Sequence, residues 1–135
     1  MLIKVLDASV LVKYLLHEEG WEEVKAIFND AVDGSFELHS LDLILKEAGS
    51  ALQRYGSRET ALKIYRKLLT QTIISYHRQD AQILEEAFDI ALQNGLSIYD
   101  AAYIALAKGL GAEFVTSDKK QADVAKSVVK VREVR

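Results

Sequence analysis

Four acidic residues occupy positions where carboxylates could do chemistry: Asp7, Glu47, Asp100 and Asp118. Asp7 follows the apolar run from Leu2 to Leu6, and Asp118 follows the strand-like stretch "EFVTS". Carboxylates about 4 Å apart repel by roughly 4 kcal/mol at an effective dielectric near 20, and a divalent cation removes that cost. Ligation by oxygen alone suits a hard ion such as Mg²⁺ or Mn²⁺. If the acids converge, the chemistry they favour is metal-assisted phosphoryl transfer.

Each acid also has a purely structural interpretation. Asp7 and Asp118 could be helix N-caps, because aspartate accepts hydrogen bonds from the unpaired N–H groups of a first helical turn. Ser97 and Asp100 have the spacing of a capping box. Glu47 has no capping interpretation, because it lies inside the helical stretch "LDLILKEAGSALQRYG" on an apolar and small-residue face. Its carboxylate either reaches water at the rim of the core or points into a cation site.

Three hydroxyl side chains lie next to two of these acids in the sequence. Ser9 follows Asp7 closely, and Thr116 and Ser117 directly precede Asp118. Such hydroxyls can orient carboxylates or metal-bound waters. Their alternative role is helix capping and turn formation.

Strand-like and helix-like segments alternate along the chain. Hydrophobic periodicity predicts strands at residues 2–6, 36–39, 72–77, 113–116 and 128–134. It predicts helices at 8–17, 21–32, from Ser40 or Asp42 to about 55, 57–69, 79–93, from 97 onward, and at 118–126. This alternation is typical of the α/β class, with a parallel sheet between helices in a three-layer α/β/α sandwich. Ligands of such sheets bind beyond the carboxyl ends of the strands, where Asp7 and Asp118 are expected.

The composition limits the possible functions. The chain has 135 residues, half of them hydrophobic, so we expect a single domain over 1–135. A net charge of −3 excludes a polybasic protein that coats nucleic acid by bulk attraction. The absence of cysteine excludes disulfides, thiolate catalysis and zinc–thiolate sites. No apolar run approaches the roughly 20 residues of a membrane span, so we expect a cytoplasmic protein without a membrane partner.

Positive charge gathers in one part of the chain. From Arg54 to Arg78 there are six lysines or arginines and one acid, Glu59. The candidate phosphate-binding residues are Arg54, Arg58, Lys119 and Lys120. The alternative for each of them is a solvated helix surface.

Three stretches carry a resemblance to a known family. They are "VLDASVLVKYLL", "LDLILKEAGSAL" and "LSIYDAAYIALAKGLGAEFVTSDKKQA". In order and spacing they resemble the PIN-domain family, particularly small stand-alone proteins similar to VapC toxins, over nearly the whole chain. The resemblance implies a five-stranded parallel sheet with an acidic pocket. By position, it implies that the catalytic and metal-binding acids are Asp7, Glu47, Asp100 and Asp118, supported by Ser9 and Thr116.

The resemblance also implies an activity and partners. The expected activity is that of an endoribonuclease that depends on Mg²⁺ or Mn²⁺ and cleaves RNA to leave 5′-phosphates, as the toxin of a toxin–antitoxin pair. A homodimer and a cognate antitoxin that covers the acidic pocket are further expectations. Gln121 departs from the family pattern, which usually has an apolar residue there. We expect this departure to affect packing rather than catalysis, because Gln121 is not expected to touch an acid.

Other functions remain open from the residues alone. A catalytically silent PIN-fold binding or scaffold protein would keep the fold without the activity, and a DNA or structure-specific nuclease would use the same metal chemistry. A phosphorylation-dependent receiver would need an adjacent acidic pair after the first strand, where Asp7 stands alone. An aspartate-based phosphatase generally has a second aspartate two residues further on, where this chain has Ser9.

Overall fold

Five short strands form one parallel sheet in the computed structural model, which describes residues 2–135. The strands are β1 (Ile3–Leu6), β2 (Glu37–Leu41), β3 (Ile74–His77), β4 (Glu113–Thr116) and β5 (Val131–Glu133). Their order in the sheet is β3-β2-β1-β4-β5, and every neighbouring pair is parallel. The predicted α/β class and parallel sheet are confirmed. Because β1 and β4 are neighbours, the segments that follow them leave the sheet at adjacent points.

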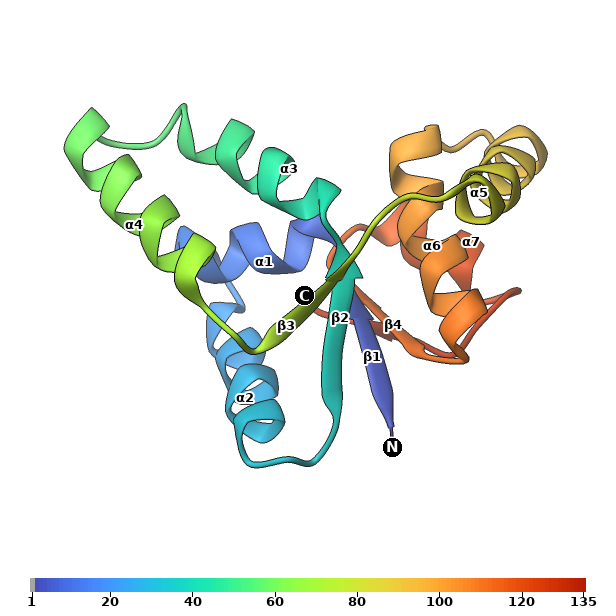
Figure 1. Cartoon of the computed structure of the whole chain (residues 1–135), viewed down its shortest axis with the longest axis horizontal. Coiled ribbons are helices and arrows are strands. Elements are labelled where there is room, and N and C mark those ends of the chain that lie inside the picture. The colour runs from blue at the N-terminus through green and yellow to red at the C-terminus, as the bar shows by residue number, and fades with distance from the viewer. Residues whose placement is uncertain (1) are drawn as a thin grey trace.

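Helices cover both faces of the sheet (Figure 1). The helices are α1 (Ala8–Leu15), α2 (Trp21–Val32), α3 (Leu43–Leu52), α4 (Arg58–Thr70), α5 (Ala81–Asn94), α6 (Ile98–Leu110) and α7 (Lys119–Ala125). In Figure 1, α1 and α2 lie on one side of the sheet, and α5, α6 and α7 lie on the other. This arrangement confirms the three-layer sandwich. The pair α3 and α4 extends from the edge where the strands end.

The alternation of side chains along the strands divides the core into two parts. Val5 and Phe114 pack in the cluster that contains α6, whereas Leu6 and Val115 pack in the cluster with buried residues of α1 and α2. Successive side chains of a strand point to opposite faces, which produces this division. In α6, all residues from 101 to 107 are buried, four of them alanines, so the helix lies deep in the structure. Asp100 stands at the exposed start of this buried helix.

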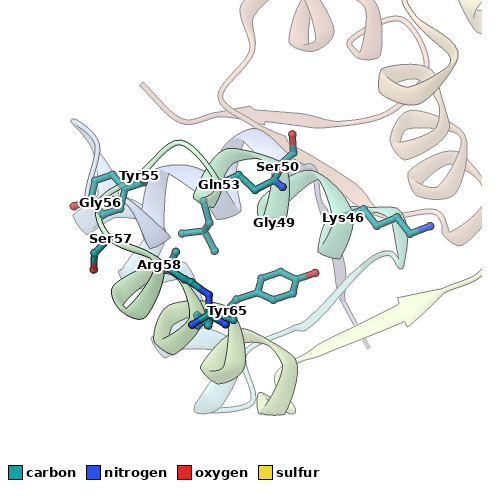
Figure 2. A pocket seen from close by; sticks show the side chains of 12 residues that line it. Lys46, Gly49, Ser50, Gln53, Tyr55, Gly56, Ser57, Arg58 and Tyr65 are labelled. Carbon is teal, nitrogen blue, oxygen red and sulfur yellow. The ribbon is translucent and has the colours of Figure 1, made fainter.

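The helices α3 and α4 pack through one aromatic side chain, Tyr65, shown in Figure 2. The hydroxyl of Tyr65 donates a hydrogen bond to the carbonyl of Leu45 (2.7 Å). A Cβ atom at Gly49 would lie 3.3 Å from the Tyr65 ring, so the glycine allows this close approach. A hollow of about 550 Å³ lies between the two helices.

Two predicted boundaries are resolved or corrected by the structure. Of the two predicted starts of the third helix, Asp42 is the N-cap of α3, whereas Ser40 lies within β2 and its hydroxyl donates to the carbonyl of Leu6 (2.7 Å). The last strand is shorter than residues 128–134, because the N–H groups of Val128 and Val129 turn back to the carbonyl of Ala125 (2.9 and 2.8 Å). Apolar alternation alone reveals none of these three hydrogen bonds.

Candidate active site at the carboxyl edge of the sheet

Asp7 and Asp118 lie beyond the carboxyl ends of the two central strands. Asp7 directly follows β1, and one residue, Ser117, separates Asp118 from the end of β4. Because Leu6 pairs with Val115, the two chain segments leave the sheet beside each other. Both aspartates are N-caps, as the structural interpretation predicts: the Oδ1 atom of Asp7 accepts from the N–H of Val10 (3.4 Å), and that of Asp118 accepts from Gln121 (2.7 Å). Capping uses one oxygen of a carboxylate, so it does not exclude metal binding.

Hydroxyl groups connect the two strand ends. Ser9 donates from Oγ to the Asp7 carboxylate (2.7 Å) and accepts from the N–H of Ser117 (2.9 Å). The Oγ1 atom of Thr116 accepts from the N–H of Asp118 (3.1 Å). Ser9 and Thr116 therefore lie where they can orient the acids. The Ser117 hydroxyl donates to the carbonyl of Val134 (2.8 Å) rather than to an acid.

Glu47 and Asp100 reach the site from two helices. Glu47 projects from α3 into a hollow of about 440 Å³, which it shares with Asp118. The full lining of this hollow is Ala8, Ser9, Val12, Glu18, Glu47, Ser117 and Asp118. Asp100 lies in the first turn of α6, where its N–H donates to the N-cap hydroxyl of Ser97 (3.1 Å). Glu18 is an additional acid at the hollow that the sequence patterns did not indicate.

Charge repulsion acts among Glu47, Asp100 and Asp118, whereas Asp7 is affected mainly by burial. Burial raises the pKa of Asp7 to about 7, against the hydrogen bonds from Ser9 and other groups that lower it. Burial also raises the pKa of Glu47, and the charge of Asp100 raises it further. The pKa of Asp100 is raised by burial and then by the charge of Asp118. Such coupling requires that the carboxylates be near one another, and it leaves a site where a cation is favourable.

Tyr103 is a member of the site that the sequence patterns missed. Its side chain is 1% exposed, and its hydroxyl donates a hydrogen bond to the carboxylate of Glu47. Burial raises the pKa of Tyr103, followed by this hydrogen bond and the charges of the surrounding acids. A signal was available, because Tyr103 is three residues after Asp100 and therefore lies on the same side of α6.

The expectation that Gln121 touches no acid is wrong. Its backbone N–H donates to the carboxylate of Asp118 (2.7 Å), and its side-chain amide donates to the backbone carbonyl of Asp100 (3.0 Å). Gln121 is buried in α7, which is why an apolar residue would be the usual choice there. The residue that departs from the family pattern therefore contacts both helix starts that carry Asp100 and Asp118.

The donor set fits a hard divalent cation held partly through water. Among residues 2–135, no three His, Asp or Glu side chains are arranged closely enough to hold one ion directly. Mg²⁺ commonly takes only one or two carboxylates and keeps several waters, so this spacing is compatible with it. The raised pKa values of Asp7, Glu47 and Asp100 give the physical reason for binding, because a cation offsets the cost of keeping these carboxylates charged.

Comparison with known proteins places the chain in a family. The family model described as "PIN domain" matches residues 4–127. This chain belongs to the PIN-domain family.

Two curated relatives and one solved structure illustrate the likeness of this PIN domain. It is 30% identical over 124 residues to "Ribonuclease VapC3" of Pyrobaculum aerophilum, covering 88% of this chain and 92% of that protein. It is 28% identical over 119 residues to "Exonuclease VapC9" of the same organism, covering 86% and 80%. The crystal structure of Mycobacterium tuberculosis VapC20, titled a "Sarcin-Ricin loop cleaving toxin", superposes with a TM-score of 0.74 at 17% identity, covering 96% and 98%. That last likeness concerns the fold.

None of the four predicted phosphate-binding cations of this PIN domain lines the acidic hollow. Lys120 donates from Nζ to the carbonyl of Gly95 (2.8 Å) and lowers the pKa of Asp100 slightly against the stronger raising effects of burial and Asp118. Lys119 is exposed, 3.6 Å from Asp123. Arg58 lines the hollow between α3 and α4 (Figure 2), and Arg54 is exposed in the turn after α3. Within residues 2–135, no helix has the length and apolar character to cross a membrane.

Proposed function

We propose that this PIN domain is a divalent-metal-dependent endoribonuclease that hydrolyses RNA phosphodiester bonds. The observation that supports the proposal is that Glu47 and Asp118 line one hollow, while the charges of Asp7, Glu47 and Asp100 all act on the buried Tyr103. The relative named a ribonuclease, at 30% identity over most of both chains, supports RNA as the substrate.

The side chains have distinct roles in the proposed reaction. Asp7, Asp118, Asp100 and Glu47 would hold Mg²⁺ or Mn²⁺, with water completing the coordination. When bound, the ion lowers the pKa of the attacking water and stabilises charge on the phosphate oxygens. Ser9 orients the Asp7 carboxylate, and Tyr103 orients Glu47. Lys119 and Lys120, on the helix that Asp118 caps, are placed to attract the scissile phosphate.

A cleavage assay with two forms of RNA tests the proposal. An end-labelled linear RNA pool is incubated with Mg²⁺ or Mn²⁺, with EDTA, and with the Asp100→Asn protein. A circular RNA of the same sequence has no end, so its cleavage requires an endonuclease. We expect metal-dependent cleavage of both forms, lost with EDTA and in the variant.

The same assay separates the alternatives. Cleavage of the linear form alone would indicate an exonuclease, the activity in the name of the second relative. Cleavage of single-stranded DNA at the same rate would favour a less selective nuclease. No cleavage of a pool of broad sequence would favour the catalytically silent binding protein.

An antitoxin is the proposed protein partner. The structural neighbour titled a toxin supports this role. A basic side chain of a partner peptide, inserted among the four acids, would offset the same repulsion that a metal ion offsets and would compete with it. Adding such a peptide should therefore lower both Mn²⁺ affinity and cleavage.

A homodimer in the cytoplasm is the proposed state of the chain. Leu84, Phe88 and Leu92 are spaced four residues apart on α5, and each is at least 40% exposed. An apolar stripe of this kind often marks a protein–protein surface. Light scattering of the wild type and of Phe88→Glu should show a dimer and a monomer, respectively.

A further inference from the structure

A buried glutamine connects the two helix starts that carry Asp100 and Asp118. Gln121 is 1% exposed, and its side-chain oxygen, its side-chain nitrogen and its backbone N–H each make a hydrogen bond. Its side-chain Nε2 donates to the carbonyl of Asp100 (3.0 Å). Its Oε1 accepts from the hydroxyl of Thr116 (2.9 Å). Its backbone N–H donates to the carboxylate of Asp118 (2.7 Å), so one residue contacts the end of β4 and the starts of α6 and α7.

The glutamine also determines the direction of the Thr116 hydroxyl. A hydroxyl group has one proton to donate. In Thr116 this proton goes to Gln121, and the oxygen accepts from the N–H of Asp118 (3.1 Å). The oxygens of Ser9 and Thr116 lie 3.3 Å apart. Because the Ser9 proton goes to Asp7 and the Thr116 proton to Gln121, neither hydroxyl donates to the other. With an apolar side chain in place of Gln121, the Thr116 proton would be free to turn toward Ser9 or Asp7.

The hydrogen bonds of Gln121 join two helix starts that carry like charges. Asp100 and Asp118 stand at the starts of the two helices that Gln121 joins, and each carries a carboxylate. Repulsion of this kind favours separation of α6 and α7 at their starts. The amide bridge of Gln121 resists the separation, because breaking it would leave buried donor and acceptor groups without partners.

We propose that Gln121 is a positioning residue of the acidic site, which sets the spacing of Asp100 and Asp118 and the direction of the Thr116 hydroxyl. The inference rests on the proposed function, because it takes these acids to bind a divalent cation. It assigns a specific role to a side chain that departs from the family pattern.

The test compares two glutamine-to-methionine substitutions in the full chain. Gln121→Met keeps the length of the side chain and removes the amide. Gln71→Met is a matched control, because the amide of Gln71 also donates and accepts: it donates to the hydroxyl of Tyr76 (2.7 Å) and accepts from the N–H groups of Ile73 and Ile74 (2.7 and 2.9 Å). These bonds lie at the start of β3, outside the acidic hollow. The readouts are Mn²⁺ affinity by calorimetry and folding by circular dichroism.

We expect Gln121→Met to weaken Mn²⁺ binding by about 10- to 100-fold, the range typical of residues that orient metal ligands. Gln71→Met should bind as the wild type does. Equal weakening in both variants, or wild-type affinity in a folded Gln121→Met protein, would overturn the positioning role. If the wild type itself binds no Mn²⁺, the metal centre of the proposed function fails first, and the role of Gln121 falls with it.

A measurement on the wild type covers the case in which Gln121→Met does not fold. The side-chain amide resonances of Gln121 and Gln71 are followed by NMR during Mg²⁺ titration. We expect the Gln121 side-chain signal to shift together with the backbone amide signals of Asp100 and Asp118. The Gln71 side-chain signal should not shift. A Gln121 signal that does not move while those backbone amides shift would overturn the inference.

Discussion

The hydroxyl of Tyr103 in α6 donates a hydrogen bond to the carboxylate of Glu47 in α3. The two residues are 56 positions apart in the sequence, and the bond joins the deeply buried α6 to the pair of helices that extends from the sheet. It also lowers the pKa of Glu47, partly opposing the increase caused by burial. Tyr103 thereby favours the charged form of Glu47, which is the form that binds a cation.

Removal of this hydroxyl should weaken metal binding more than it weakens the fold. For Tyr103→Phe we expect about a 10-fold or greater loss of Mn²⁺ affinity, with a decrease of about 1 kcal/mol in the free energy of unfolding. Tyr65→Phe is the control, because it removes a similar hydroxyl bond, to the carbonyl of Leu45, without touching an acid. Calorimetry and urea unfolding measure the two quantities. Equal Mn²⁺ affinities for the two variants would contradict the role of Tyr103.

Asp100→Asn should abolish cleavage and leave the fold intact. Asparagine keeps the size of the side chain and the backbone N–H that Ser97 caps, and it removes the repulsion from Asp118. We expect activity to fall by more than about 100-fold, because a direct metal ligand matters at least as much as the residues that orient it. Cleavage of the RNA pool and circular dichroism check the two parts. An unfolded Asp100→Asn protein would favour a structural role for the carboxylate.

The stability of the metal-free protein should depend on the ionisation of Asp7. Burial raises the pKa of Asp7 from 3.8 to about 7, so the folded state binds this proton more tightly than the unfolded state. The resulting stabilisation is fully present below about pH 4 and is lost as the pH rises through about 7. Asparagine does not ionise, so Asp7→Asn should exceed the wild type in stability at pH 8, by up to about 4 kcal/mol, and match it near pH 4.

Urea unfolding in EDTA across this pH range measures the effect. Asp80→Asn is the control, because Asp80 also caps a helix, α5, but is exposed and keeps its carboxylate hydrated. If the free energies of unfolding of Asp7→Asn and the wild type differed by the same amount at every pH, ionisation of Asp7 would not be the cause of the difference.

Lys120 should influence the pH dependence of cleavage through Asp100. The positive charge of Lys120 lowers the pKa of Asp100, although burial and Asp118 raise it more. In Lys120→Met this opposing effect is lost, so the pKa of Asp100 rises and the acidic limb of the pH–rate profile should move to higher pH. Lys119→Met is the control on the same helix, since Lys119 is exposed and lies near Asp123 instead. A shift of the same size in both variants would indicate a general loss of positive charge.

Local patterns were sufficient for the architecture of this chain. Apolar runs and alternation predicted the strands, and helical spacing with capping residues predicted the helices, because both depend on neighbours within a few positions. Asp7 and Asp118 were correctly expected beyond strand ends and as N-caps. The motifs that surround Glu47 and Asp100 indicated the family, which the match over residues 4–127 confirms. The roles of these acids in metal binding stay predictions.

Tertiary structure decided which polar groups meet. The pairing of β1 with β4 brings Asp7 beside the segment of Asp118, more than 100 residues later, through backbone hydrogen bonds that no side-chain pattern encodes. The bond from Tyr103 to Glu47 and the bridge of Gln121 to the carbonyl of Asp100 depend on burial, which leaves polar groups no partners except those that the packing supplies. The sequence by itself determined which acids stand at the ends of the elements. The packing determined which side chains orient them.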